Sequence, residues 1–223
     1  MRSMITLVGT VHLDPDGYPR LVLLLEKLRP ALISVEVSGY ALKFRRQNGE
    51  RLAARLEGFR RPDGTLPEGL AAVEAQLQIP FEHRAAHDYA RLNRAKLVCI
   101  GDSRRSQALL DILERELLAT DNLVTLALRK DVPLSELVAR EWARARREFE
   151  KGPLAGTDSA RRLAAANRKM ARRIRTLAAA GSNLVHVGGW EHLAGLSELL
   201  SDLAPQVALL SPETISWQGG EPP

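Results

Sequence analysis

The chain has 223 residues, of which 45% are hydrophobic and 26% are charged. This length and composition predict one globular domain with a core of its own, and they exclude a disordered chain. The formal net charge of +5 is small for this length and requires no anionic partner, so we do not expect a nucleic-acid-binding protein.

Cysteine content and hydropathy further limit the class of protein to which the chain can belong. Cys99 is the single cysteine, so an intrachain disulfide is excluded, and we expect it in a buried strand. No apolar stretch approaches the roughly 20 residues of a membrane span, and the N-terminus lacks the pattern of a signal peptide. These features predict a soluble, cytoplasmic protein without a membrane partner.

Short apolar runs alternate with helical patterns along the chain. The runs predict buried strands at residues 4–8, 32–37, 97–100, 184–187 and 207–210. Each run is continuous rather than alternating, which is typical of strands covered on both faces of a parallel sheet. Helical patterns occupy residues 19–28, 38–56, 83–92, 103–118 and 190–203. The alternation predicts an α/β fold with a largely parallel central sheet flanked by helices.

Two segments interrupt this alternation. Residues 60–67 are rich in Pro, Gly and Asp and predict a surface loop. Residues 120–181 contain no strand pattern. We therefore predict a helical insertion or lid there, before the fourth strand and within a single domain of residues 1–223.

Glycines and polar side chains follow four of the predicted strands. These segments are Gly9-Thr10-Val11-His12, Glu36, Gly101-Asp102 with Arg104 beyond it, and Gly188-Gly189-Trp190-Glu191-His192. Sites in open α/β sheets form beyond the carboxyl ends of parallel strands. We therefore expect His12, Glu36, Asp102 and His192 to converge at one edge, where the Gly-x-x-His unit occurs twice.

The convergent residue types suit two kinds of chemistry. His12, Glu36 and His192 would form a first shell for a divalent metal such as Zn²⁺, Mn²⁺, Fe²⁺ or Co²⁺, which lowers the pKa of bound water to about 7 in favourable cases. Without a metal, His12 would act as a general base oriented by Glu36. The sequence leaves both alternatives open.

Other polar residues have structural alternatives. Asp102 is equally suited to the site and to capping the helix that follows it. His186 lies inside the fourth predicted strand, where it would either line the site or fill the core, and we favour the core. His83 and His87 are four residues apart on a predicted helix, but without a glutamate directly after His83 we do not expect a separate metal site there.

In their order along the chain, these motifs resemble the TraB/PrgY/TIKI family and its more distant erythromycin-esterase and ChaN-like relatives. Gly9-Thr10-Val11-His12 is similar to the opening motif of the family, Glu36 to its strand-terminal glutamate, and Gly189-Trp190-Glu191-His192 to its second motif. Between them, Glu82 begins an Ala-containing helix, Asp102 and Arg104 follow the third strand, and Arg168 precedes Met170 and Ala171.

The resemblance implies a fold and an activity. It implies an α/β core with a helical insertion, and a site of His12, Glu36 and His192 with an arginine, either Arg104, Arg105 or Arg168. It also implies Glu82, with Gly9, Thr10, Gly188 and Gly189, among the residues that bind a ligand. The family includes members that resemble metal-dependent peptidases. It also includes proteins that act on small peptides by degrading or sequestering them.

We therefore expect a hydrolase that acts on a small peptide or an ester. Its mechanism would be either metal-dependent or metal-free. In this hypothesis Asp102 orients a histidine, and Arg104 or Arg168 stabilises developing negative charge. The alternative is a protein that binds a small peptide or an anionic ligand in the same pocket without turnover. A homodimer is compatible with the sequence, but no pattern specifies one.

Overall fold

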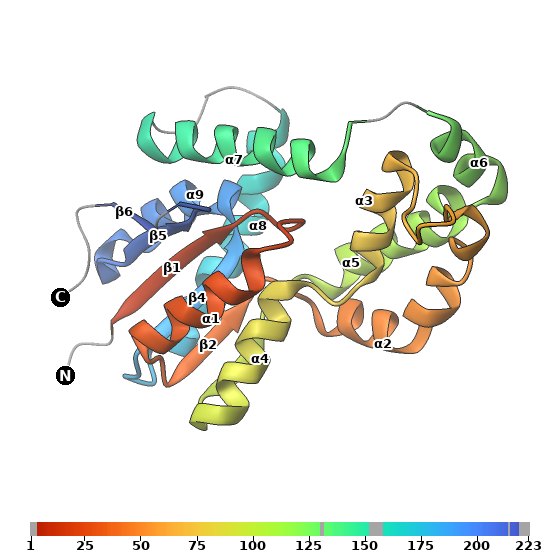
Figure 1. Ribbon diagram of the computed structural model, residues 1–223. Coiled ribbons are helices and arrows are strands. Elements are labelled where there is room, and N and C mark those ends of the chain that lie inside the picture. The colour runs from red at the N-terminus through yellow and green to blue at the C-terminus, as the bar shows by residue number, and fades with distance from the viewer. Residues whose placement is uncertain (1–3, 130–131, 152–157, 214, 219–223) are drawn as a thin grey trace. The chain divides into compact units, whose positions relative to one another are not determined.

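The computed structural model describes residues 4–129, 132–151, 158–213 and 215–218. Within these residues one sheet contains the strands β1 (Ile5–Thr10), β2 (Leu32–Val35), β3 (Lys96–Cys99), β4 (Leu184–Gly189), β5 (Gln206–Leu210) and β6 (Ile215–Gln218). Their order in the sheet is β3-β2-β4-β1-β5-β6 (Figure 1). All neighbours are parallel except β5 and β6, which are antiparallel. The predicted α/β fold with a largely parallel sheet is therefore confirmed.

Burial along the strands follows their place in the sheet. Every residue of the neighbouring strands β1 and β4 is buried, as the continuous apolar runs predict. The edge strand β3 is more open, and Cys99 in it is only partly buried. β6 was not predicted, because four residues with two apolar positions give little signal and an antiparallel edge strand needs no buried run.

The chain divides into two compact units, which we describe separately. The sheet unit comprises Met1–Glu36, Phe81–Ile100 and Glu141–Pro223. Its helices are α1 (Gly17–Leu28), α4 (Phe81–Asn93), the end of α7 (Leu134–Lys151), α8 (Asp158–Ala178) and α9 (Leu193–Leu199), with 3-10 turns at Trp190–His192 and Ser201–Leu203. α1 packs on α4, while α8 packs on α9 and β4. These two pairs cover opposite faces of the sheet (Figure 1).

The helical unit comprises Val37–Pro80 and Gly101–Arg140. Its elements are α2 (Gly39–Ala53), a 3-10 turn at Glu57–Phe59, α3 (Glu68–Leu77), α5 (Ser103–Ile112), a π turn at Leu113–Leu117, α6 (Thr120–Leu128) and the start of α7. It has its own hydrophobic core, in which Leu52, Leu56 and Leu70 are almost completely buried. Residues 60–67 form the predicted loop, whereas α3 was not predicted.

The segment expected to be a helical insertion is divided between the units. Its described part contains helices only, α6, α7 and α8, and it precedes β4 as predicted. Residues up to Arg140 belong to the helical unit, and residues from Glu141 belong to the sheet unit. α8 is therefore part of a helical layer that covers one face of the sheet.

Gly9 allows α9 to lie directly against β1. A Cβ at this position would overlap the Leu193 side chain and lie 3.0 Å from the Cα of Trp190. The absence of a side chain at Gly9 thus fixes how closely the turn after β4 approaches the first strand.

We expect Gly9→Ala to lower the free energy of unfolding by about 1–3 kcal/mol, because overpacking forces neighbouring groups to shift. Urea denaturation of the variant beside the wild type measures this loss. Gly39→Ala is the matched control, since a Cβ there meets nothing within 4 Å. Equal stabilities for both variants would contradict the prediction.

Candidate functional site

Parallel pairing brings the ends of three strands together. β4 lies between β1 and β2, with Thr10 beside Gly189 and Val35 beside Val187 in register. The carboxyl ends of these strands therefore meet at one edge of the sheet. His12, Glu36 and His192 follow these ends, as the sequence predicts.

His12 pairs with a glutamate from α4. Its Nδ1 lies 2.8 Å from Oε1 of Glu82, and the Thr10 hydroxyl donates to the same oxygen over 2.9 Å. Glu82 is 2% exposed and stands in the first turn of α4, where the helix dipole favours a negative charge. The carboxylate therefore fixes the His12 ring by one edge.

The other edge of the His12 ring is open. The His12 side chain is 56% exposed, and within the described part of the chain no hydrogen bond is made by its Nε2. This nitrogen is the only histidine nitrogen of the site that a bound molecule can reach without displacing a partner, since His192 is engaged at both of its nitrogens.

His192 forms a second pair with Glu36. Its Nε2 lies 3.0 Å from Oε1 of Glu36, and its Nδ1 is hydrogen-bonded to Oδ1 of Asn167 on α8. The second oxygen of Glu36 accepts the Gly189 N–H over 2.9 Å. His192 is 4% exposed, so both its position and its ring orientation are fixed by protein groups.

Glycines make room for both pairs. A Cβ on Gly188 would lie 2.8 Å from Oε2 of Glu36, and one on Gly189 would lie 2.9 Å from Nε2 of His12. A Cβ on Gly195 would overlap the amide of Asn167. These side chains approach the backbone more closely than any other residue type permits.

The pKa values of His12 and Glu36 are shifted in opposite directions. Desolvation lowers the pKa of His12, but the hydrogen bond and charge of Glu82, with the charges of Glu36 and Glu191, outweigh it and raise this pKa to about 9. Desolvation raises the pKa of Glu36, but the hydrogen bond and charge of His192, the charge of His12 and the Gly189 N–H lower it to about 2. At neutral pH, His12 is therefore mostly protonated and Glu36 is ionised.

His186 lies in the core beneath this edge, as the sequence predicts. It is 1% exposed, and its Nδ1 is 3.0 Å from the Ser34 hydroxyl. Burial is the main cause that lowers the pKa of His186 to about 4. The ring is neutral at physiological pH. Its hydrogen bond to Ser34 joins β4 to the neighbouring strand β2.

Four other expected residues lie in the helical unit or on the exposed side of α8. Asp102 caps α5 by accepting the N–H groups of Arg104 and Arg105, and all three belong to the helical unit. Arg168 is exposed on α8, and the neighbouring Asn167 contacts His192 instead. The glutamate that holds His12 is Glu82, whereas the sequence had assigned this role to Glu36.

Asn167 is a side chain of the candidate site that the sequence reasoning missed. It lies 5% exposed on the buried side of α8, which also carries the buried apolar residues Met170 and Ile174. A polar residue inside an apolar stripe was the available signal, because such a residue is buried only when it has a partner. Glu82 was named from the family resemblance alone.

Two of the three predicted metal ligands are engaged by protein groups. No group of three or more His, Cys, Asp or Glu side chains in the described part of the chain is arranged to hold a metal ion. His192 uses both ring nitrogens for protein partners, and Glu36 uses both oxygens. We therefore derive no chemical step through a metal.

Comparisons with known proteins add no identification. No protein-family model matches the chain, and searches of curated proteins and of solved structures find no match. The resemblance to the TraB/PrgY/TIKI family therefore stays a prediction from the motifs. None of the described helices is long and apolar enough to cross a membrane.

The His12–Glu82 pair predicts a pH-dependent stability. A histidine whose folded pKa exceeds its unfolded value stabilises the fold fully below about pH 6.5. This contribution is lost as the pH rises through about 9. We expect an NMR titration of the His12 ring to give a pKa near 9, and Glu82→Gln to lower that value.

Urea denaturation between pH 6 and 10 provides the second measurement. The wild type should lose stability across this range more than Glu82→Gln does, by a small amount because solvent screens the half-exposed His12. A His12 ring that titrates near the ordinary histidine pKa of about 6.5 would contradict the prediction.

Proposed function

We propose that the protein is a hydrolase that acts on a small peptide or an ester through His12. The observation that carries this proposal is the His12–Glu82 pair, in which a buried carboxylate fixes Nδ1 while Nε2 stays open beside a second His–Glu pair. A carboxylate that orients an imidazole with one free nitrogen is the usual arrangement of a general base.

The proposed reaction begins with a water molecule at Nε2 of neutral His12. Nε2 takes a proton from the water while the water oxygen bonds to the substrate carbonyl carbon, and the carbonyl oxygen becomes an oxyanion. The oxyanion then re-forms the carbonyl, the bond to the leaving amine or alcohol breaks, and His12 returns the proton to that leaving group. Glu82 stabilises the imidazolium that exists between the two steps.

The second pair has an electrostatic and positioning role in this proposal. Ionised Glu36 is a weak base, given its pKa of about 2, and His192 is buried. The negative charge of Glu36 raises the pKa of His12 and so makes neutral His12 a stronger base. Asn167 and the Gly189 N–H hold this charge in place.

A second candidate function is binding without turnover, and one observation favours it. The pKa of about 9 makes His12 a cation at neutral pH, and its open nitrogen can donate to an anion. A carboxylate of a small peptide would then bind at His12. Product formation by wild-type protein separates this alternative from the hydrolase.

A divalent metal at His12, Glu36 and His192 is a separate proposal from the sequence. Binding it would require His192 and Glu36 to exchange their present partners for the metal. Elemental analysis of metal-loaded wild type beside His12→Ala tests it, with about one equivalent in the wild type alone as the supporting outcome.

We expect His12→Ala to lower kcat for peptide or ester hydrolysis by about 10²–10⁴-fold, the usual contribution of a general base. The measurement is initial rates on a panel of peptides and nitrophenyl esters. The matched control is His87→Ala, because His87 also lies beside a carboxylate, Asp88 at 3.3 Å, but that carboxylate is 41% exposed and the pair does not follow a strand end. Hydrolysis by the wild type that survives in His12→Ala would overturn the assignment.

The pH dependence of kcat/KM follows from the same pKa. With a pKa of about 9, roughly one His12 in a hundred is neutral at pH 7, since each pH unit changes this fraction about tenfold. The rate of a reaction that uses neutral His12 should rise between pH 7 and 9 and then level off. A rate that falls above pH 9 would assign His12 as a proton donor instead.

A further inference from the structure

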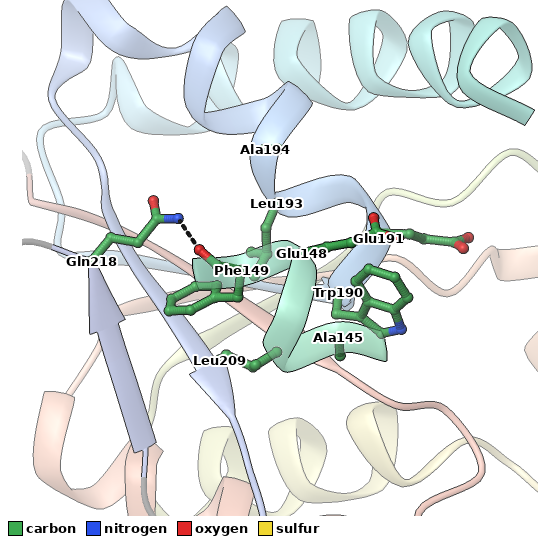
Figure 2. A pocket seen from close by; sticks show the side chains of 9 residues that line it. All are labelled: Ala145, Glu148, Phe149, Trp190, Glu191, Leu193, Ala194, Leu209 and Gln218. Atoms are coloured by element: carbon green, nitrogen blue, oxygen red, sulfur yellow. Dashed lines mark hydrogen bonds between the residues drawn. The ribbon is translucent and has the colours of Figure 1, made fainter. Parts of the chain in front are cut away.

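A hollow lies at the end of β4, next to the candidate site. Its walls come from the end of α7, from the turn and helix after β4, and from β5 and β6, all within the sheet unit (Figure 2). The hollow has a volume of roughly 350 Å³, solvent-open space included. Gln218 on β6 donates to the carbonyl of Phe149 on α7, which ties the two elements beside it.

The lining of the hollow is mainly apolar. Phe149, Trp190, Leu193 and Leu209 supply most of its walls, and Figure 2 shows the Phe149 and Trp190 rings on either side of α7. The indole N–H of Trp190 donates to Glu141 over 2.9 Å, so this ring is held in place. Such walls favour an apolar group of a ligand.

The charges at the hollow are negative. Glu148 and Glu191 are lining residues. Glu148 pairs with Arg144, whose guanidinium also lies 5.3 Å from the Trp190 ring centroid. Glu191 is exposed and forms no ion pair within the described part of the chain. Its carboxylate would repel an acidic group placed in the hollow.

Glu191 connects the hollow to His12. A Cβ on Gly189 would lie 2.9 Å from Nε2 of His12 and 3.7 Å from Cγ of Glu191. The open nitrogen and the stem of Glu191 thus flank the same backbone position. A substrate whose carbonyl group lies at His12 would have its neighbouring side chain within reach of the hollow.

We propose that this hollow is a specificity subsite that takes one small apolar side chain next to the scissile bond and rejects acidic side chains. This inference rests on the proposed hydrolase function and names its substrate class. The apolar walls and the carboxylate of Glu191 set the preference for apolar over acidic side chains.

The first test compares nitrophenyl esters of N-acetyl-leucine and N-acetyl-aspartate. We expect wild-type kcat/KM to be at least about tenfold higher for the leucine ester, the lower end of what one apolar pocket contributes. Ala194→Phe should abolish this preference by filling the hollow, because the exposed Ala194 is one of its lining residues. Equal rates on both esters with wild type would overturn the proposal.

The matched control is Ala143→Phe, which makes the same change at an exposed α7 residue outside the lining. It should keep the leucine preference. Thermal unfolding of both variants verifies that they are folded. A loss of preference in Ala143→Phe equal to that in Ala194→Phe would also count against the subsite.

A second variant tests the charge. Glu191→Gln should raise kcat/KM for the aspartate ester relative to the leucine ester by about 3–10-fold, since it removes the unpaired negative charge. The readout is the ratio of the two esters within one protein, so a general change in His12 reactivity cancels. An unchanged ratio would overturn the part of the proposal that concerns charge.

Binding separates the subsite from the hydrolase function. N-acetyl-leucine amide and N-acetyl-aspartate amide are titrated into His12→Ala and into His12→Ala with Ala194→Phe, and the Trp190 indole resonance is followed by NMR. Leucine-amide binding that Ala194→Phe abolishes would support the subsite even if no ester is hydrolysed. Ester hydrolysis by wild type without any leucine preference would support the hydrolase and overturn the subsite.

Discussion

Two consecutive glycines at the end of β4 are the constraint on which the site depends. The carboxylate of Glu36 and the ring of His12 lie where the side chains of Gly188 and Gly189 would otherwise be. Any larger residue would push one His–Glu pair away from the sheet edge. The same strand carries His186, which is buried in the core next to the site. β4 therefore contributes both the glycines at the sheet edge and a buried histidine behind them.

The strands β1 to β5 and the two histidines were predictable because their signals are local. A continuous apolar run predicts a buried strand, and a residue that follows such a run lies at the sheet edge. His12, Glu36 and His192 needed no further information than that. The parallel order β2-β4-β1 then brought them together.

The partners of these histidines were harder to predict, because they come from helices far away in the sequence. Glu82 reaches His12 from α4 and Asn167 reaches His192 from α8. Helical periodicity tells which side of a helix is buried, but not which strand end that side meets. Arg168 shows the limit: one position along α8 separates the exposed arginine from the buried asparagine that makes the contact.

Asp102 illustrates a different limit of the sequence. Capping and catalysis use the same residue types at the same place, directly after a strand and before a helix. The side chain accepts two backbone N–H groups at the start of α5, which satisfies the capping interpretation. The division into two units also could not be read from composition, because each unit is assembled from segments far apart in the sequence.

The raised pKa of His12 has a consequence for the charge of the whole molecule. The formal value of +5 counts every histidine as neutral, whereas His12 keeps its proton until about pH 9. The protein therefore carries one positive charge more at neutral pH than its composition gives. It releases that proton in the range where lysines begin to titrate, so its electrophoretic mobility should change less than expected near pH 6.5 and more near pH 9.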